Sequence, residues 1–403
     1  MAEQDKKFKL FTLKNLKLAA VFIAVFGFGM FVSEANLINL DKYIQIKGVN
    51  QQPSEQLDYR AVEEVYRKLQ SSFDGELDQK KLEDGLREGL VRAAGDPFTE
   101  FLDEEASKEF EENLNGSFEG IGAELSKDEE FIIIVSPIEG FPAKKAGLRS
   151  KDAIVEINGE STIDISVTEA VKKIRGPKGT KVKLGIIRDG QRLDFEITRA
   201  TISIPSVKTE KIGKDIGVVR ISRFGEDTEG LARQAAAEFK AANVSRVILD
   251  LRGNPGGLLG SSVDVASAWL EEGKTILQEK RGGEVIETYF ASGNSVFNGV
   301  KTVVLIDGGS ASASEIVAGA LKDNKAAVLI GEESFGKGSV QDVNRLDFGG
   351  ILKVTVARWF TPSGVNIDKD GIKPDKQVKI TEQDIKVGKD PQEAAAIAYL
   401  RKL

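Results

Sequence analysis

The chain has 403 residues, a length at which two or three domains are expected. Of these residues 41% are hydrophobic and 30% charged, values that are typical of globular proteins. Its formal net charge of −7 argues against nucleic-acid binding. It contains neither histidine nor cysteine, which excludes a Ser-His-Asp triad, a cysteine protease, a zinc site built from His or Cys ligands, and any disulfide bond.

The first 35 residues combine a basic flank with a short apolar stretch. Five lysines fall within residues 1–17, and residues 18–32 are uncharged and apolar. That stretch is short for a bilayer span, which needs about 20 apolar residues, and long for the core of a signal peptide. A retained membrane anchor and a cleaved signal peptide both fit, and we favour the anchor. In either case the basic flank stays in the cytoplasm and the rest is exported, to the periplasm or the cell exterior.

Residues 36–57 are polar and irregular and indicate a linker. The next region, 58–106, shows apolar residues at helical spacing over 60–94 with a break at 74–75, which predicts two amphipathic helices. The segment that follows, 96–102, is expected to pack against the rest of the protein rather than to take part in chemistry.

Residues 107–200 carry a glycine-containing loop followed by a regular order of short elements. The loop reads FEGIGAEL, and the backbone N–H groups of its central residues can turn inward as a nest for a carboxylate; these residues are Gly120, Ile121, Gly122 and Ala123. Strands over 132–135, 152–159 and 181–188, a helix over 167–174 and an Asn158-Gly159 hairpin turn are predicted after it. This order resembles a PDZ domain, which implies that an extended peptide C-terminus binds beside the next strand edge. Arg175, just after the helix, is expected to be exposed, and either to help sense that ligand or to be simply solvated.

Residues 201–380 alternate β-branched apolar runs with segments of helical spacing. Strands are predicted over 216–221, 244–251, 302–306 and 326–330, and helices over 231–242, 263–270 and 312–322. Such alternation indicates an α/β sheet layer. The final region, 381–403, is predicted to hold a helix from Asp390, with Pro391 at its first position.

A glycine-rich turn, DLRGNPGG at residues 250–257, joins one of these strands to the next helix. A tight strand–helix turn is by itself a sufficient reason for its glycines. The same turn also presents backbone N–H groups of the kind that stabilise an oxyanion.

The stretch 307–341 holds a serine cluster at a predicted helix start and Lys337 between two glycines. Without histidine, a serine nucleophile needs another base, and burial can bring a lysine pKa from about 10.4 toward the ~7–8 that a general base requires. A structural role and a nucleotide site are the two alternatives to this chemistry. Ser312 with Glu315 fits a capping box before an apolar run. Residues 331–337 nearly match a phosphate-binding loop, but Gly338 stands where Ser or Thr is needed and a strand follows, so we do not predict ATP binding.

SASASE at 310–315 and FGKGSVQ at 335–341 resemble the carboxy-terminal processing proteases, also called tail-specific proteases or S41 serine peptidases, and the resemblance extends over about residues 60–380. It implies that Ser312 is the nucleophile, that Lys337, 25 residues later, is the general base, and that Gln341 positions the lysine. On a strand, Lys337, Ser339 and Gln341 would share one face. The resemblance also implies a crotonase-like core and an oxyanion hole made by the N–H groups of Ala313 and Gly257, with Gly256 as the alternate.

The sequence therefore predicts an α/β, crotonase-like serine protease core with an inserted or preceding PDZ-like domain and an N-terminal helical segment. The expected activity is that of an exported serine endopeptidase that captures substrates with apolar C-termini through its PDZ domain, with no metal or other cofactor. The alternative is a catalytically inactive PDZ scaffold protein of the cell envelope. A homodimer or higher oligomer, a regulatory adaptor and the membrane are the further partners that the family and the N-terminal segment suggest.

Overall fold

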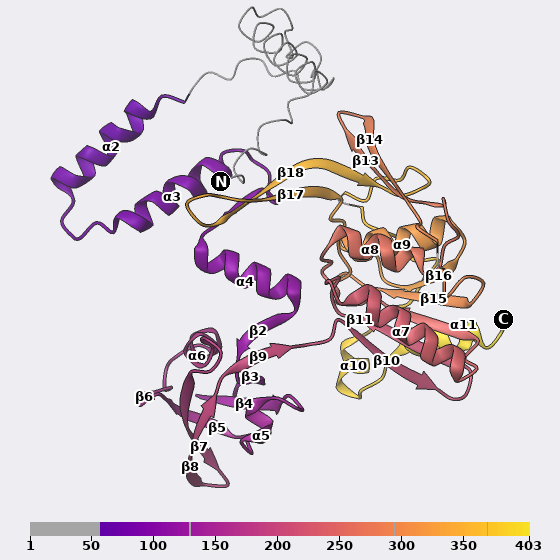
Figure 1. Cartoon of the computed structure of the whole chain (residues 1–403), viewed down its shortest axis with the longest axis horizontal. Helices are drawn as coiled ribbons and strands as arrows, with labels where there is room; N and C mark the ends of the chain where they lie inside the picture. The colour runs from indigo at the N-terminus through magenta and orange to yellow at the C-terminus, as the bar shows by residue number, and fades with distance from the viewer. Residues whose placement is uncertain (1–56, 129, 294, 369) are drawn as a thin grey trace, which may run out of the picture. The chain divides into compact units, whose positions relative to one another are not determined.

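The structure is a computed structural model and describes residues 57–403 except 129, 294 and 369 (Figure 1). The predicted anchor or signal segment and nearly all of the predicted linker lie outside the described residues. The chain divides into two compact units, the first ending at Leu77 and the second running from Asp78 to Leu403. Among the described residues, no helix is both long and apolar enough to cross a membrane.

Both predicted N-terminal helices are present, but they belong to different units. In the first unit, α2 (Tyr59–Ser72) begins after Asp58, whose side chain accepts a hydrogen bond from the Arg60 N–H at 3.1 Å, as an N-cap residue does. None of its residues is buried, so its apolar positions face solvent. The second helix, α3 (Gln79–Arg92), opens the second unit in the same way, with Asp78 as its N-cap residue.

A six-stranded sheet forms the centre of the α/β layer, with strand order β10-β11-β12-β15-β16-β19. Its strands are β10 (Val207–Ile212), β11 (Ile216–Ile221), β12 (Arg246–Asp250), β15 (Lys301–Ile306), β16 (Ala327–Gly331) and β19 (Lys376–Gln377), and only β10 runs antiparallel to its neighbour. The helices are α7 (Thr228–Ala241), α8 (Leu259–Ser267), α9 (Ala313–Asp323), the short α10 (Glu382–Lys386) and α11 (Pro391–Leu400). The predicted alternation of strands and helices is confirmed.

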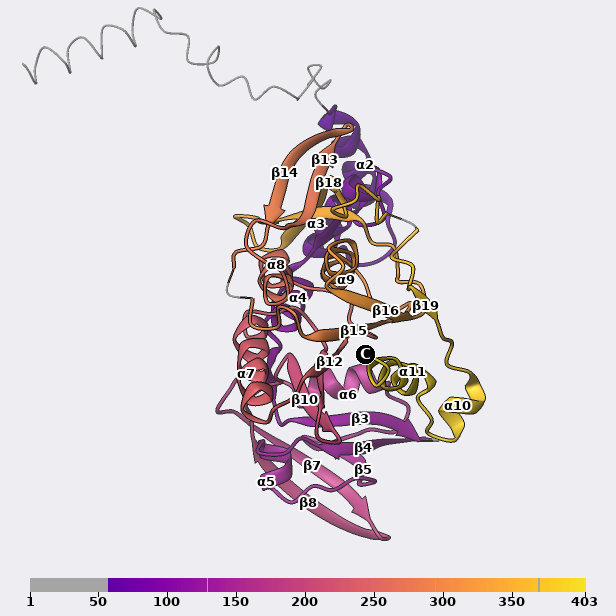
Figure 2. The ribbon, with the colours of Figure 1, turned by 90° about the vertical axis from the view of Figure 1, so that its right-hand side faces the viewer.

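Alternate residues of the central strands bury against opposite layers of helices. On β15, Val304 and Ile306 pack in the cluster that α7, α8 and α9 cover, whereas Val303 and Leu305 pack with residues of α11. Figure 2 shows α8 and α9 on one side of β15 and α11 on the other. Because both faces of the sheet are covered, its strands are nearly continuous runs of apolar residues. Such runs could be recognised as strands in the sequence.

A second, antiparallel sheet stands beside this layer and was only partly predicted. It contains β1 (Glu100–Leu102), β13 (Thr275–Arg281), β14 (Glu284–Phe290), β17 (Ser339–Arg345) and β18 (Ile351–Phe360). The β13–β14 hairpin was not predicted. The pairing of β1 with β18 brings residues 100–102 against 351–353, across some 250 residues of chain.

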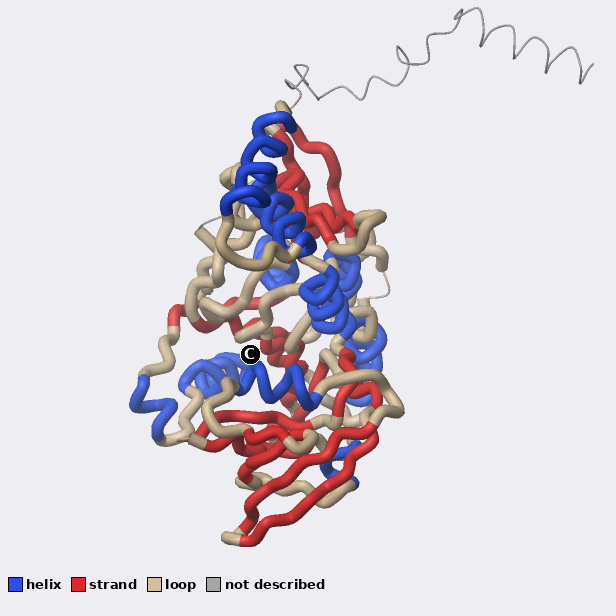
Figure 3. Tube along the Cα trace, turned by 90° about the vertical axis from the view of Figure 1, so that its left-hand side faces the viewer, coloured by secondary structure: helices blue, strands red, loops and turns tan. Residues whose placement is uncertain are grey.

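The PDZ-like region is built from an antiparallel sheet of order β3-β4-β5-β7-β8 with two helices (Figure 3). Its elements are β2 (Ser117–Gly120), β3 (Ala123–Asp128), β4 (Phe131–Pro137), α5 (Pro142–Lys145), β5 (Ala153–Ile157), β6 (Glu160–Ser161), α6 (Val167–Ile174), β7 (Lys181–Arg188), β8 (Gln191–Thr198) and β9 (Ala200–Ser203). Asn158 and Gly159 both have positive φ and connect β5 to β6 in a two-residue hairpin, as predicted. The chain enters this region from α4 (Glu104–Asn115), which ends at Gly116 with a left-handed φ of 60°.

Two helices begin three to four residues before their predicted starts. The helix predicted over 231–242 begins at Thr228, and that predicted over 263–270 spans Leu259–Ser267. Both begin in stretches rich in glycine, serine and threonine, where the spacing of apolar residues carries little information.

Candidate active site

Ser312 stands at a sharp turn between the carboxyl end of β15 and the first residue of α9. Its backbone angles are φ 54° and ψ −113°, which differ from the extended conformation of an ordinary N-cap residue. The Ser312 N–H donates to the Glu315 carboxylate at 2.7 Å, so the Glu315 half of the predicted capping box is formed. A non-glycine residue held at positive φ stores strain, which recurs at functional sites.

Glu315 connects the serine turn to the lysine loop. The residue is 0% exposed, and its carboxylate accepts hydrogen bonds from the Ser334 hydroxyl at 2.6 Å and from three backbone N–H groups, those of Gly336 at 2.7 Å, Ser312 at 2.7 Å and Lys337 at 3.0 Å. Burial raises the pKa of Glu315, and these hydrogen bonds oppose the rise. The capping-box prediction included Glu315 but missed that it also fixes the backbone of the lysine.

Lys337 is a half-buried amine near one aromatic ring. Burial first, and then the charge of Lys353, lower the pKa of Lys337 below its ordinary value, while Glu100 and Glu315 act against the decrease. Its Nζ lies 5.4 Å from the centre of the Phe98 ring. Compared with a solvent-exposed lysine, this amine is more readily neutral, because burial disfavours the charged form.

The Phe98 segment packs against the rest of the protein, and one of its contacts is with the candidate-site residue Gln341. The Gln341 side-chain amide donates to the Phe98 carbonyl, which fixes the direction of the amide. The segment itself is held by Asp96, which accepts hydrogen bonds from the hydroxyls of Thr99 at 2.6 Å and Thr355 at 2.5 Å. No local sequence signal connects Phe98 to residues more than 200 positions later.

The sequence predicted that Lys337, Ser339 and Gln341 share one face of a regular strand, but the structure does not place them on one. β17 begins at Ser339, so Lys337 precedes it, and the pairing of β17 with β18 shifts register between Val340 and Gln341. Nevertheless these three residues line the same cavity. A register shift of this kind, as at a β-bulge, often changes the direction of a side chain beside a functional site.

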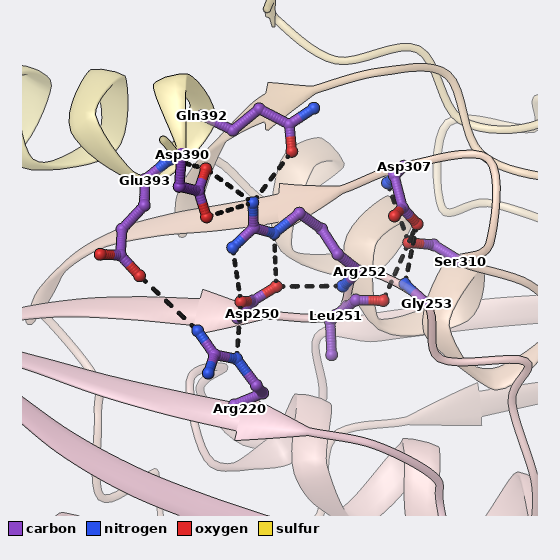
Figure 4. A network of polar contacts seen from close by, with 10 residues as sticks. All are labelled: Arg220, Asp250, Leu251, Arg252, Gly253, Asp307, Ser310, Asp390, Gln392 and Glu393. Carbon is purple, nitrogen blue, oxygen red and sulfur yellow. Dashed lines mark hydrogen bonds and ion pairs between the residues drawn. The ribbon is translucent and has the colours of Figure 1, made fainter. Parts of the chain in front are cut away.

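An ion-pair network holds the glycine-rich turn after β12 (Figure 4). Asp250 is 2% exposed and accepts hydrogen bonds from Arg252 at 2.8 Å and Arg220 at 2.9 Å. Burial acts to raise the pKa of Asp250, but these arginines hold it below its usual value. Arg252 also reaches Asp390 at 2.9 Å and Gln392 at 3.1 Å, so the network joins the turn to the start of α11.

Gly256 and Gly257 differ in what their N–H groups do. The Gly256 N–H donates to the Asn254 side chain at 2.9 Å. The N–H groups of Gly257 and Ala313 have no acceptor among the residues that the structure describes. A Cβ added to Gly256, at φ 108°, would lie 2.9 Å from the Ser312 Cβ and 3.1 Å from the Ala313 nitrogen, so the glycine turn directly contacts the serine turn. Of the two glycines, Gly257 has the available donor.

Substituting Gly256 by alanine is expected to lower the free energy of unfolding by about 2–4 kcal/mol, because the new Cβ combines positive-φ strain with overpacking against Ser312. Gly260, four residues later in α8, is the matched control, since an added Cβ there meets nothing within 4 Å. Gly260→Ala should leave the stability unchanged or raise it by up to about 1 kcal/mol. Urea unfolding of both variants measures the difference, and equal stabilities would contradict the close contact.

The serine, the lysine, the glutamine and the two glycines line one cavity of about 370 Å³. Its lining includes Ser312, Ala313, Lys337, Ser339, Gln341, Gly256 and Gly257, together with an apolar wall of Phe110, Leu114, Leu258, Leu259, Ile316 and Trp359. Arg223 and Lys353 line it as well. A hydroxyl, an amine of lowered pKa and two unengaged N–H groups beside an apolar pocket are the parts that acyl transfer requires.

The predicted peptide-binding loop of the PDZ-like region lies between β2 and β3. Gly120 ends β2, Ala123 begins β3, and Ile121 and Gly122 connect them. β3 is an edge strand of its sheet and packs against α6, so a strand edge and a helix border the loop. This is the arrangement that peptide capture by strand addition uses.

Arg175 is not the exposed residue that the pattern predicted. It is half-buried, its guanidinium donates to Glu112 of α4 at 3.1 Å, and it lies 4.5 Å from the centre of the Phe118 ring. The prediction failed because both partners come from segments more than 50 residues earlier in the chain.

Comparisons with known proteins agree on which domains the chain contains. Residues 215–378 match the model of peptidase family S41, and residues 110–187 match that of the PDZ domain. Over 317 residues the chain is 40% identical to the carboxy-terminal processing protease CtpA of Bacillus subtilis (strain 168), covering 78% of this chain and 67% of the relative. Over 336 residues it is 38% identical to a "Probable CtpA-like serine protease" of Staphylococcus aureus (strain MSSA476), covering 82% of this chain and 66% of the relative. The chain thus spans about two thirds of the length of these relatives.

Among solved structures, a protein assigned to the S41 proteases from Bacteroides fragilis NCTC 9343 superposes with a TM-score of 0.51 at 16% identity, over 78% of this chain and 89% of that one. At that identity the likeness concerns the fold alone.

Proposed function

The chain belongs to peptidase family S41, and from this premise we propose that it is a serine endopeptidase in which Ser312 is the nucleophile and Lys337 the general base. The observation that carries the proposal is the convergence of Ser312, Lys337, Gln341 and the two unengaged N–H groups on one cavity. The predicted scaffold alternative gives no reason for this convergence.

The reaction begins when the Ser312 Oγ attacks the carbonyl carbon of the substrate and its proton passes to the neutral Lys337 Nζ. The oxyanion that forms receives hydrogen bonds from the N–H groups of Gly257 and Ala313. Collapse of this intermediate breaks the C–N bond, and the Lys337 ammonium returns the proton to the leaving amine, which leaves an acyl group on Ser312. Water, deprotonated by Lys337, then attacks the ester carbonyl and releases the carboxylate product and the free serine.

The apolar wall of the cavity gives the substrate side chain its environment. Phe110 and Leu114 of α4 lie on this wall with Trp359 of β18. An apolar side chain next to the scissile bond is therefore the preferred one, since it gains from burial against such a wall. We also place the catalytic part outside the cytoplasm, on the ground of the five lysines that precede the apolar stretch near the N-terminus.

We expect the PDZ-like region to bind the C-terminal tail of the substrate through the loop at residues 120–123. Substituting Gly122 by alanine tests this role of the loop. The φ of Gly122 is 75°, and an added Cβ would lie 2.6 Å from the Phe141 Cβ, so the substitution should distort the loop. Gly122→Ala should raise KM about tenfold for an unfolded protein with three apolar C-terminal residues, a loss of about 1.4 kcal/mol in binding. The same substrate with an amidated C-terminus should be cleaved with the raised KM by both enzymes.

Gly140→Ala is the matched control for this experiment. Its φ of 82° gives comparable backbone strain, but an added Cβ meets nothing within 4 Å. Initial rates over a range of substrate concentrations separate the two variants. A Gly122→Ala enzyme that keeps its preference for the free, apolar tail would contradict tail capture by this loop.

A further inference from the structure

Ser339 is a buried hydroxyl that the reaction described above does not use. It is the first residue of β17, two positions after Lys337, and it is 2% exposed. Its Oγ has no hydrogen-bond partner among the residues that the structure describes, although it lines the candidate active-site cavity. Buried hydroxyls are nearly always paired, so an orphaned one that borders a reaction site indicates a partner that the resting geometry does not engage.

Two other buried polar atoms in the described part of the chain lack a partner, and neither has the same meaning. Ser261 lies in α8 and does not line this cavity. The Arg223 Nε does border the cavity, but the same guanidinium already donates to Asp227 at 3.3 Å and to the Asn115 carbonyl at 3.4 Å. Ser339 alone among the three combines a wholly unengaged side chain with a place beside the lysine.

The hydrogen-bonding needs of the lysine indicate what that hydroxyl can do. A neutral amine has one lone pair and two N–H bonds, and an ammonium has three N–H bonds. In the proposed reaction the lone pair faces Ser312. Because the Gln341 amide nitrogen is directed at the Phe98 carbonyl, its Oε1 is the end that remains to accept one N–H. The second N–H still needs an acceptor.

The nearby carboxylates are already engaged. Glu315 accepts four hydrogen bonds, of which only the backbone N–H comes from Lys337, and Glu100 is paired with the Lys353 ammonium. Lys337, Ser339 and Gln341 line the same cavity at alternate positions of one segment. Ser339 is therefore the side-chain acceptor that this segment itself supplies.

We propose that the Ser339 hydroxyl is a positioning group, which accepts a hydrogen bond from the Lys337 Nζ and thereby directs the lysine lone pair at Ser312. The proposal rests on the proposed function, because it concerns the base of that reaction. It adds a fourth residue to the serine, lysine and glutamine that the sequence indicated.

A hydrogen bond to the Ser339 hydroxyl would also change the pKa of Lys337. The charged groups that face this amine are Lys353, which lowers its pKa, and Glu100 and Glu315, which raise it, and Arg223 lines the same cavity. A hydroxyl acceptor stabilises the ammonium more than the neutral amine, because the bond to the charged donor is the stronger one. Removing the hydroxyl should therefore lower the pKa of Lys337 further, even though catalysis becomes slower.

Ser339→Thr and Ser339→Val test this in the full chain, because the two new side chains have the same shape and differ only in the hydroxyl. NMR titration of protein labelled at lysine Cε and Nζ measures the pKa directly, and the Lys337 signal is the one absent from Lys337→Arg. We expect a pKa about half a unit or more lower in Ser339→Val than in Ser339→Thr. An equal or higher pKa in Ser339→Val would overturn the proposal.

Cleavage kinetics give the second readout and separate this proposal from the proposed function. Ser339→Val should lose about 10- to 100-fold in kcat relative to Ser339→Thr with little change in KM, and the rising limb of its pH profile should move to lower pH. Equal kcat values and coincident limbs would also overturn the proposal. If the unmodified chain fails to cleave but the two lysine pKa values differ as expected, the contact between Ser339 and Lys337 stands and the proposed function fails.

Discussion

Replacing Ser312 by alanine is expected to abolish peptide-bond cleavage while the fold remains intact. The substitution removes the only atom that forms the acyl-enzyme, and the loss in kcat should be about 10⁵-fold or more, as for other covalent serine enzymes whose nucleophile is removed. Residual catalysis by the Gly257 and Ala313 N–H groups is slow by comparison. The backbone strain at φ 54° is similar for serine and alanine, so the thermal unfolding midpoint should change by only a few degrees.

Ser312→Asn separates a nucleophile from a helix cap. Asparagine caps helix N-termini as well as serine does and tolerates positive φ better than most residues, but it cannot form an acyl-enzyme. If Ser312 only caps α9, the asparagine variant should cleave like the unmodified chain. We expect both variants to be inactive toward an unfolded protein substrate, with fragments quantified by mass spectrometry. Cleavage by Ser312→Ala at the original rate would show that another residue is the nucleophile.

The strands β11, β12, β15 and β16 of the central sheet could be predicted because their burial is nearly complete and local. β11 and α6 were predicted with the bounds that the structure gives them. A doubly covered strand such as β11 reads as an apolar run, and α6 has its place in the order of elements that resembles a PDZ domain. The β13–β14 hairpin was missed for the opposite reason. Its β14 strand leaves Val285 and Ile286 exposed, and β13 pairs with β18, which lies far along the chain.

In the candidate site, too, the residues in local motifs were predicted and the contacts with distant segments were not. The serine and the lysine stand in motifs of a few residues, and the resemblance that these motifs carry was enough to single them out. Contacts around the candidate site come from distant segments: the Gln341 amide donates to the Phe98 carbonyl, and Arg252 donates to Asp390, the N-cap residue of α11. A sequence pattern carries no record of such contacts, so the contact between Phe98 and Gln341 was not predicted.

Replacing Lys337 is also expected to cause a large loss of peptide-bond cleavage, because the proposed reaction has no other base. Lys337→Met keeps the length of the side chain and Lys337→Arg keeps the charge, but neither offers a lone pair at pH 7, since arginine is always protonated there. Both should lose about 10⁴-fold or more in kcat. Lys240→Met, on the exposed face of α7, is the control and should be fully active. Activity of Lys337→Arg within tenfold of the unmodified enzyme would remove lysine as the base.

The pH profile of the unmodified enzyme should carry the signature of this lysine. An ordinary lysine is neutral in only about one molecule in a thousand at pH 7.4. Burial of Lys337 and the Lys353 charge lower the pKa of Lys337, so the neutral, active form appears at a lower pH than for a free lysine. The value of kcat/KM should therefore rise with pH through an apparent pKa below 10.5 and then level off. A rising limb at or above the pKa of free lysine would mean that the cavity does not desolvate the amine, and that the base of the reaction lies elsewhere.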